Sequence, residues 1–280
     1  MIKLRNNLML MLKGGAIGVA NIIPGVSGGT IAVVLGIYEY LIEAISNFTT
    51  NKEKRKEYLI FLIKIAIGAL TVVFLSAKLM KYLLENHNIY TNLAFVGLIA
   101  GSIPSIYKTH DEMKLNIISI ITFLLGVAII LFFEFTFPNT VKEEGIKIAF
   151  NLTFNSAIFL CLAGFFAGGS MIVPGISGSF IMLLMGQYYI VTSCVADREI
   201  IPLGIVGIGV FIGVIAFAKL INFLLKRFPK ETFYFILGLV VASLYSIYPG
   251  MPDNTIQIII ASSVATFCLL ISYIIGKKSV

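Results

Sequence analysis

The chain has 280 residues, of which 58% are apolar and only 12% are charged, with a net charge of +7 and a strongly positive mean hydropathy. This composition excludes a water-soluble domain and indicates a polytopic membrane protein. An excess of positive charge is typical of cytoplasmic loops that face anionic lipids, so it does not predict nucleic-acid binding.

In chain order, the basic N-terminus leads into residues 8–48, which are long enough for two helices broken at PGVSGG. A spanning helix needs about 20 mainly apolar residues. Three such stretches follow, at 58–84, 90–107 and 115–137. The same order returns with a second broken region at 148–195, followed by stretches at 200–225, 232–248 and 255–275. We therefore expect an all-α membrane protein in which each half is a broken-helix hairpin plus three transmembrane helices. We expect the hairpins to re-enter the membrane, although pairs of full spans also fit their length.

The two broken regions are copies of one another. Residues 14–39, GGAIGVANIIPGVSGGTIAVVLGIYE, return as residues 164–189, GFFAGGSMIVPGISGSFIMLLMGQYY. Between the copies the chain passes through one hairpin and three spans, which is an odd number of crossings. The halves should therefore have opposite orientations, with residues 1–140 as the first inverted repeat and 141–280 as the second, in one integral membrane domain. Inverted repeats with paired broken helices are typical of secondary transporters.

The distribution of basic residues gives an independent indication of topology, because cytoplasmic loops collect Lys and Arg. With the N-terminus inside, most of the 21 Lys and Arg fall in cytoplasmic segments, and only Lys142, Lys147 and Arg198 fall in outer loops. We therefore expect a multi-pass protein of the plasma membrane with both termini in the cytoplasm.

The residue types at each break suit an anion. Glycines permit close approach, Pro24 can interrupt the preceding helix, and Ser27 can cap the next one. The unpaired N–H groups at such a helix start favour negative charge. Two breaks facing each other would hold one anionic headgroup. The alternative is that the breaks only shape tightly packed helices.

Charged residues in the apolar segments provide further candidates. Lys78 and Lys219 occupy the same position in the two halves, and an ionisable residue at membrane depth is a functional hypothesis. Alternatively, they snorkel to the interface. Lys64 and Glu134 have no charged counterpart in the other half; they could couple transport to a proton or cation, or pair with each other. Glu39 lies one helical turn from the end of the first motif.

Other chemistry is not indicated. The three cysteines have no metal-like spacing, and the chain carries no cofactor motif and no catalytic constellation. We therefore expect no metal ion, no cofactor and no enzymatic activity. The oligomeric state stays open.

The segments ANIIPGVSGGTIAVVLGIYE and SMIVPGISGSFIMLLMGQY resemble the two signature segments of the bacterial polyprenyl-phosphate transporter family. The resemblance covers nearly the whole chain. It implies that a polyprenyl-phosphate lipid, undecaprenyl phosphate, is moved back across the plasma membrane for reuse in cell-wall synthesis. The second copy departs from the first at Met171, Ser179 and Phe180. The signature falls on Asn21, Pro24, Gly25, Ser27, Gly28, Gly29, Thr30 and Glu39, and on Pro174, Gly175, Ser177, Gly178 and Ser179.

Three other functions stay open at this point. The first is a secondary transporter of a small soluble anion, which would use the same inverted repeats. The second is an intramembrane serine hydrolase, because both breaks contain a GxSG pattern; it would need a general base such as His87, His110 or Lys78 near the serine. The third is a structural or regulatory membrane subunit, which would not need duplicated breaks.

Overall fold

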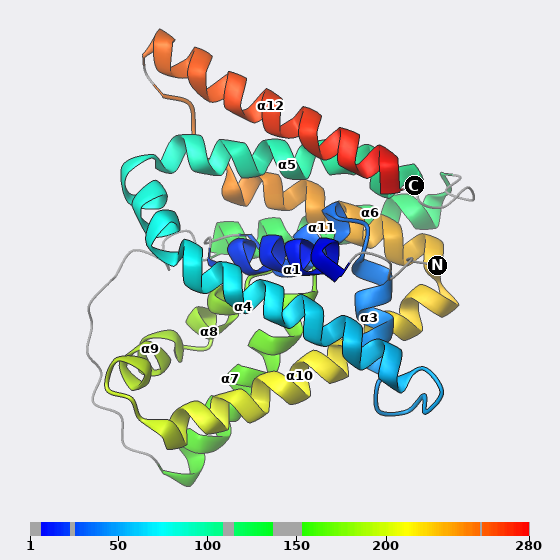
Figure 1. Ribbon diagram of the computed structural model, residues 1–280, viewed down its shortest axis with the longest axis vertical. Coiled ribbons are helices and arrows are strands. Elements are labelled where there is room, and N and C mark those ends of the chain that lie inside the picture. The colour runs from blue at the N-terminus through cyan, green and yellow to red at the C-terminus, as the bar shows by residue number, and fades with distance from the viewer. Residues whose placement is uncertain (1–6, 23–25, 109–114, 137–152, 253, 280) are drawn as a thin grey trace.

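The computed structural model of the chain describes residues 7–22, 26–108, 115–136, 153–252 and 254–279 (Figure 1). The regular elements of this part of the chain are all α-helices. In chain order they are α1 (Asn7–Ile22), α2 (Gly28–Val34), α3 (Tyr38–Asn47), α4 (Arg55–Asn86), α5 (Asn88–Lys108), α6 (Ile117–Thr136), α7 (Phe154–Ile172), α8 (Gly178–Leu184), α9 (Tyr188–Ala196), α10 (Ile200–Arg227), α11 (Pro229–Ile247) and α12 (Thr255–Ser279).

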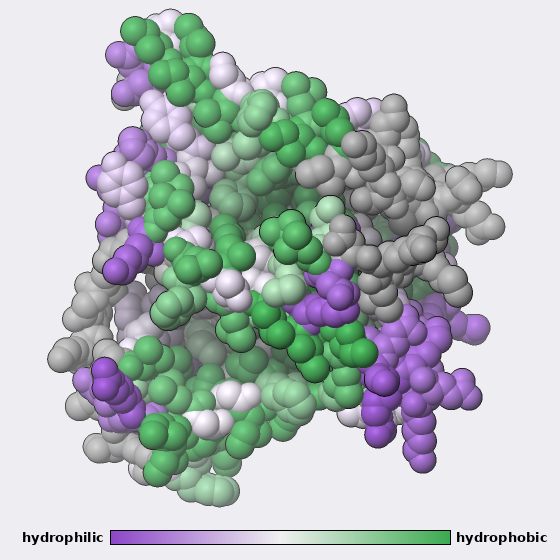
Figure 2. Space-filling model, in the orientation of Figure 1, coloured by the Kyte–Doolittle hydropathy of each residue, from purple (hydrophilic) through white to green (hydrophobic). Residues whose placement is uncertain are grey.

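Long apolar helices dominate the molecule. Within the described residues, six helices are long and apolar enough to cross a membrane, and the bent pair α8 and α9 raises the number to seven if it forms one span. The six expected stretches all fall on helices; α7 joins α4, α6, α10, α11 and α12 as a candidate span, whereas α5 does not. Figure 2 shows an apolar surface over much of the visible face, with hydrophilic residues gathered where α3 connects to α4. This surface suits a lipid environment.

Each hairpin contains a bend that the sequence analysis did not predict. Instead of two helices, each motif region forms three, because α2 and α8 end after seven residues. Gly36 follows α2 with a φ of +64°, and Gly186 follows α8 with a φ of +68°. In each copy the glycine N–H and the next N–H bond back to carbonyls of the short helix, as in a Schellman motif. The second copy bends by 115° at this point.

The helices pair in a pattern that repeats between the halves. α1 packs along α4, and α7 packs along α10 in the same way. α5 packs along α12 and α6 along α11, so these two pairs each join one helix from each half. The same order of six helices therefore occurs twice, and the last two helices of each half pack against the last two helices of the other half. The expected boundary between residues 140 and 141 lies outside the described residues, and the two-repeat division stays a prediction.

Several helix ends lie together on one side of the molecule. In Figure 1 the starts of α1 and α4 and the ends of α10 and α12 lie on one side of the molecule, where α3 also lies, whereas α9 lies on the other. The end of α10 carries Lys226 and Arg227 in its last turn. The opposite orientation of the two halves in a membrane stays a prediction.

Small residues bring the paired helices into backbone contact. A Cβ atom added at Gly14 on α1 would collide with the carbonyl of Ile65 on α4, and one added at Gly164 on α7 would collide with the carbonyl of Val206 on α10. The same relation holds one turn later for Gly18 with Ala69 and for Gly168 with Val210. Close approach of this kind drives helix association in lipid, where no hydrophobic effect acts between helices.

The packing predicts that alanine substitutions at two nearby glycines of α10, Gly207 and Gly209, change stability differently. A Cβ at Gly209 would collide with the Cys161 carbonyl of α7, whereas Gly207 has open space. We expect Gly209→Ala to lower the melting temperature in detergent, because overpacking costs about 1–3 kcal/mol. Gly207→Ala is the matched control, and we expect it to leave the melting temperature unchanged or to raise it, because alanine favours helix. Equal melting temperatures for the two variants would contradict the described α7–α10 contact.

Candidate functional site

The first break separates α1 from α2, and side chains of the chain itself close it. Ser27 occupies the N-cap of α2 in an extended conformation, and its Oγ accepts a hydrogen bond from the Thr30 N–H at 3.1 Å. Asn21, near the end of α1, accepts one from the Gly28 N–H at 3.0 Å. The predicted capping role of Ser27 is confirmed. Two of the N–H groups expected to face an anion are therefore occupied.

The first break also contacts the second. The Gly175 N–H donates to Thr30 Oγ1 at 2.8 Å and lies 3.2 Å from Ser27 Oγ. The Ser27 hydroxyl lies 3.3 Å from the Val173 carbonyl oxygen, to which it donates. Ser27 and Thr30 are only 2% and 1% exposed. A broken helix leaves backbone groups that lipid cannot satisfy, and here hydroxyls of one copy satisfy the backbone of the other.

Tyr38 adds a third hydroxyl to this contact. Its O–H donates to the Ile172 carbonyl at 3.1 Å, and the side chain is buried. Gly29 lies against the same carbonyl, where a Cβ would have no room. The sequence analysis did not select Tyr38; its repetition as Tyr188 is the signal that marks it. We call the contact of the Ser27, Thr30 and Tyr38 hydroxyls with the backbone of 172–175 the latch.

The second break is more open than the first. Ser177 precedes α8 with an extended backbone, but its side chain makes no cap hydrogen bond. Its Oγ instead lies 2.7 Å from the Oγ of Ser179, which is exposed, while Ser177 is half-buried. Pro174 is buried, and Gly175 has a φ of +83°, which favours glycine. The equivalent serines of the two copies therefore have different surroundings.

The open pair of hydroxyls has a definite chemical capacity. Each hydroxyl can donate one hydrogen bond and accept others. Two hydroxyls side by side can both donate to the oxygens of one anion, and hydrogen bonds to an ionised acceptor are the stronger kind. Among the described residues no group of three His, Cys, Asp or Glu side chains is placed to hold a metal ion. The second break is thus suited to an anion bound by hydroxyls.

Lys78 and Lys219 lie on α4 and α10, and both side chains are exposed. The glycine contacts of α1 with α4 and of α7 with α10 set the register within each helix pair, and both lysines come after the last of these contacts, toward the ends of α4 and α10.

Glu39 and Gly178 do not join the latch in the described part of the chain. Glu39 is exposed in the first turn of α3. Pro24 and Gly25 lie outside the described residues. Gly178 begins α8, next to the open serine pair.

Lys64 and Glu134 do not pair with each other. Lys64 Nζ donates to Asn7 Oδ1 at 2.6 Å, which ties α4 to the start of α1. Glu134 accepts a hydrogen bond from the Ser246 hydroxyl at 2.9 Å, which ties α6 to α11. The interpretation of these charges as a mutual ion pair is wrong, because different helix pairs hold them.

The geometry does not present either break serine as a nucleophile. In the described part of the chain, the partners of Ser27 and Ser177 are hydroxyls and backbone groups. His87 ends α4, where its ring contacts those of Tyr82 and Tyr90. His110 lies outside the described residues. A serine nucleophile needs a base within hydrogen-bond reach.

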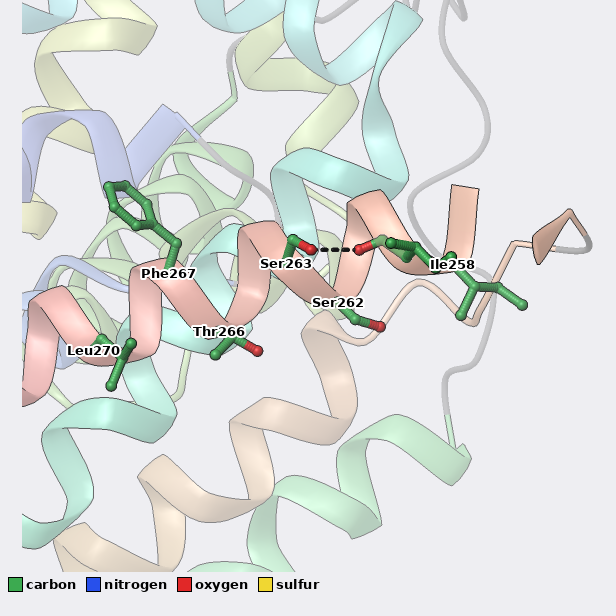
Figure 3. A pocket seen from close by; sticks show the side chains of 7 residues that line it. Ile258, Ser262, Ser263, Thr266, Phe267 and Leu270 are labelled. Carbon is green, nitrogen blue, oxygen red and sulfur yellow. Dashed lines mark hydrogen bonds between the residues drawn. The ribbon is translucent and has the colours of Figure 1, made fainter. Parts of the chain in front are cut away.

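A surface hollow of about 560 Å³ lies along α12, away from the breaks (Figure 3). Its lining belongs to α12 alone, and Ser263 in it donates to the Ile259 carbonyl of its own helix at 2.7 Å. Its two serines and one threonine thus provide useful control positions rather than a built site.

Comparison with known proteins agrees with these features. The model of a family described as undecaprenyl phosphate translocase-like matches residues 17–267. A polyprenyl-phosphate transporter of Staphylococcus aureus is 33% identical over 283 residues, covering 95% of both chains. A polyprenyl-phosphate transporter of Vibrio cholerae is 34% identical over 258 residues, covering 88% of this chain and 79% of that protein. No solved structure matches. The chain is therefore a multi-pass membrane protein that belongs to the undecaprenyl phosphate translocase-like family.

Proposed function

We propose that this protein carries polyprenyl phosphate across the bacterial plasma membrane, with the phosphate headgroup bound where the two breaks meet and the tail left in lipid. Both named relatives are polyprenyl-phosphate transporters, which supports this substrate class. Undecaprenyl phosphate, returned for reuse as a lipid carrier, is the substrate that we infer. Both termini are cytoplasmic in this proposal, and the protein is not an enzyme.

The observation that carries the proposal is the pair of serine hydroxyls at the second break, which form no helix-cap hydrogen bond. Ser177 and Ser179 lie 2.7 Å apart and are at least partly exposed, while the backbone just before them is held by the latch. Rigid positioning lowers the entropy lost on binding. The serine pair therefore offers phosphate oxygens two donors on a backbone that is already fixed.

The first copy has a supporting role in this arrangement. Its hydroxyls are buried and occupied, so in this conformation they hold the second break rather than face a ligand. Asn21, Gly28 and Gly29 maintain the start of α2 and its close approach to the second copy. The headgroup site that we propose is thus shared by both copies, with different duties for each.

Lys78 and Lys219 supply positive charge on the long helices α4 and α10. A lysine stem can run along apolar surface while its ammonium group reaches a polar region. From exposed positions on these helices, the two ammonium groups can guide an anionic headgroup that arrives from lipid.

The serine pair generates a prediction about binding. We expect the Ser177→Ala, Ser179→Ala double variant to bind undecaprenyl phosphate at least roughly tenfold more weakly, because two hydrogen bonds to a charged group are lost, each worth about 1.5–3 kcal/mol. Affinity is measured on purified protein in detergent. The Ser262→Ala, Ser263→Ala variant on α12 is the matched control and should bind like the wild type.

The same assay separates the substrate classes. A neutral polyprenol should bind weakly because it lacks the phosphate, and inorganic phosphate should compete poorly because it lacks the tail. Equal competition by inorganic phosphate would favour a transporter of small anions. Unchanged affinity in the double-serine variant would remove these hydroxyls from the headgroup site.

The latch generates a prediction about stability rather than binding chemistry. The Ser27→Ala, Thr30→Val variant leaves the half-buried Gly175 N–H without its hydroxyl partners. An unsatisfied buried group costs about 1–3 kcal/mol, so the melting temperature in detergent should fall. Ser263→Ala, Thr266→Val has the same residue types at the same spacing on an exposed face, and should not change it. An unaltered melting temperature in the first variant would show that the latch does not hold the fold.

The lysine proposal is tested by charge reversal. We expect Lys219→Glu to slow transport of the lipid phosphate into or out of proteoliposomes more than Lys230→Glu, because Lys219 lies within the candidate membrane span of α10 and Lys230 lies in the first turn of α11. Both variants change the net charge by the same amount. Equal rates for the two would leave snorkelling as the whole role of Lys219.

A further inference from the structure

Phe180 lies beside the open serine pair of the second break. It directly follows Ser179 in the chain, and in the repeat it occupies the position of Thr30. In the first copy the Thr30 hydroxyl lies 3.0 Å from that of Ser27, so a side chain at this position reaches the serine that precedes the short helix. Ser177 and Phe180 have the same spacing, and residues three apart are neighbours on a helix surface. The second copy thus has an aromatic side chain where the first has a hydroxyl.

The ring of Phe180 begins a row of three rings that leads from the break to the outside of the molecule. It meets the ring of Phe133 on α6 at 5.8 Å, with an angle of 83° between the planes. The ring of Phe133 meets that of Phe132 at 5.9 Å, and Phe132 is 63% exposed. Because α6 is a candidate membrane span, an exposed apolar residue on it faces lipid. We call Phe180, Phe133 and Phe132 the aromatic row.

The repeat does not provide the same row at the first break. Thr30 and Ile274 stand at the positions equivalent to Phe180 and Phe133. Thr30 is buried and belongs to the latch, whereas Phe180 is half-buried and α8 contains no fully buried residue. The aromatic row therefore accompanies the break whose hydroxyls are open.

Hydroxyl donors beside an apolar surface suit one kind of lipid phosphate better than another. In a polyprenyl phosphate the hydrocarbon chain is joined directly to the phosphate. In a glycerophospholipid such as phosphatidic acid, a glycerol with ester groups lies between the phosphate and the chains. Burial of these polar groups against aromatic rings is unfavourable unless they find hydrogen-bond partners. The serine pair with Phe180 next to it therefore matches a phosphate that is followed at once by hydrocarbon.

We propose that the aromatic row binds the first part of the hydrocarbon chain, and that Phe180 thereby selects lipids in which this chain follows the phosphate directly. The inference rests on the proposed function. The phosphate lies on Ser177 and Ser179, and the chain runs along Phe180 and Phe133 to Phe132, where it enters lipid. The tail is in an apolar environment before binding as well, so contact with the rings adds packing rather than a hydrophobic gain. The row therefore acts on specificity more than on affinity.

Two single-chain ligands test this selectivity on the unchanged protein. Dodecyl phosphate and lauroyl lysophosphatidic acid each carry one phosphate and one chain, but only the second has a glycerol ester between them. Each ligand competes with undecaprenyl phosphate for the purified protein in detergent. We expect the wild type to bind dodecyl phosphate about tenfold more tightly, because the glycerol ester meets apolar rings. Equal competition by the two ligands would overturn the inference.

Substitutions of Phe180 test which residue makes the selection. We expect Phe180→Ala to reduce the preference for dodecyl phosphate by about tenfold, because removal of the ring admits water to the glycerol ester. Phe180→Leu keeps a large apolar side chain and should retain the preference. Phe267→Ala is the matched control, because it removes an exposed ring from α12, away from the breaks, and it should behave like the wild type.

The preference is a ratio of two affinities on the same protein, so a general loss of stability or of headgroup binding does not change it. The melting temperature of each variant shows that it is folded. A folded Phe180→Ala variant with the wild-type preference would overturn the role of Phe180. If this variant does not fold, the comparison of the two ligands on the wild type still decides the inference.

The failure of this inference differs from failure of the proposed function. If the wild type does not bind undecaprenyl phosphate, or binds it equally well without Ser177 and Ser179, the proposed headgroup site is wrong. If binding depends on the serines but shows no preference between the two ligands, or a preference that does not depend on Phe180, only the role of the aromatic row is wrong.

Discussion

The structure depends on one constraint: backbone polar groups inside a membrane must find partners within the protein. Each motif breaks a helix at a Gly-Pro-Ser sequence, which frees N–H and C=O groups in an apolar segment. The latch resolves this for the second break, because the hydroxyls of Ser27, Thr30 and Tyr38 take the backbone of 172–175 as partners. Two breaks that contact each other are stable where one isolated break would not be.

The latch also explains why two copies of one sequence have diverged in environment. Thr30 in the first copy corresponds to Phe180 in the second, so the second copy cannot return the same hydroxyl contact. Phe180 packs on Phe133 of α6 instead. Because the second copy lacks the threonine hydroxyl, Ser177 and Ser179 have each other as partners. A duplicated motif thus provides a structural half, which is buried, and an open half, which is chemically available.

Around the two breaks, polar side chains are few and lie at definite positions on the helix pairs. The helix pairs α1–α4 and α7–α10 approach through glycines, and each pair carries one exposed lysine, Lys78 or Lys219. Val173 and Ile176 of the second break pack against a buried cluster of α6 and α11, and between the same two helices Glu134 accepts a hydrogen bond from Ser246. Hydroxyls, two ammonium groups and one carboxylate form a small set of groups, and a lipid phosphate needs no more than hydrogen bonds and charge from the protein.

The sequence by itself determined the membrane class, the helical stretches, the duplication and the cap at Ser27, because composition, hydrophobic length and residue type act locally. It did not reveal the bend at Gly36 and Gly186, whose positive φ depends on a turn between two short helices. Only the tertiary structure decided that the breaks touch, that the Ser27 hydroxyl is occupied while that of Ser177 is open, and that Lys64 and Glu134 have separate partners. These facts depend on which helices pack together, and the glycine contacts and cross-half pairs that set this packing join residues far apart in the chain.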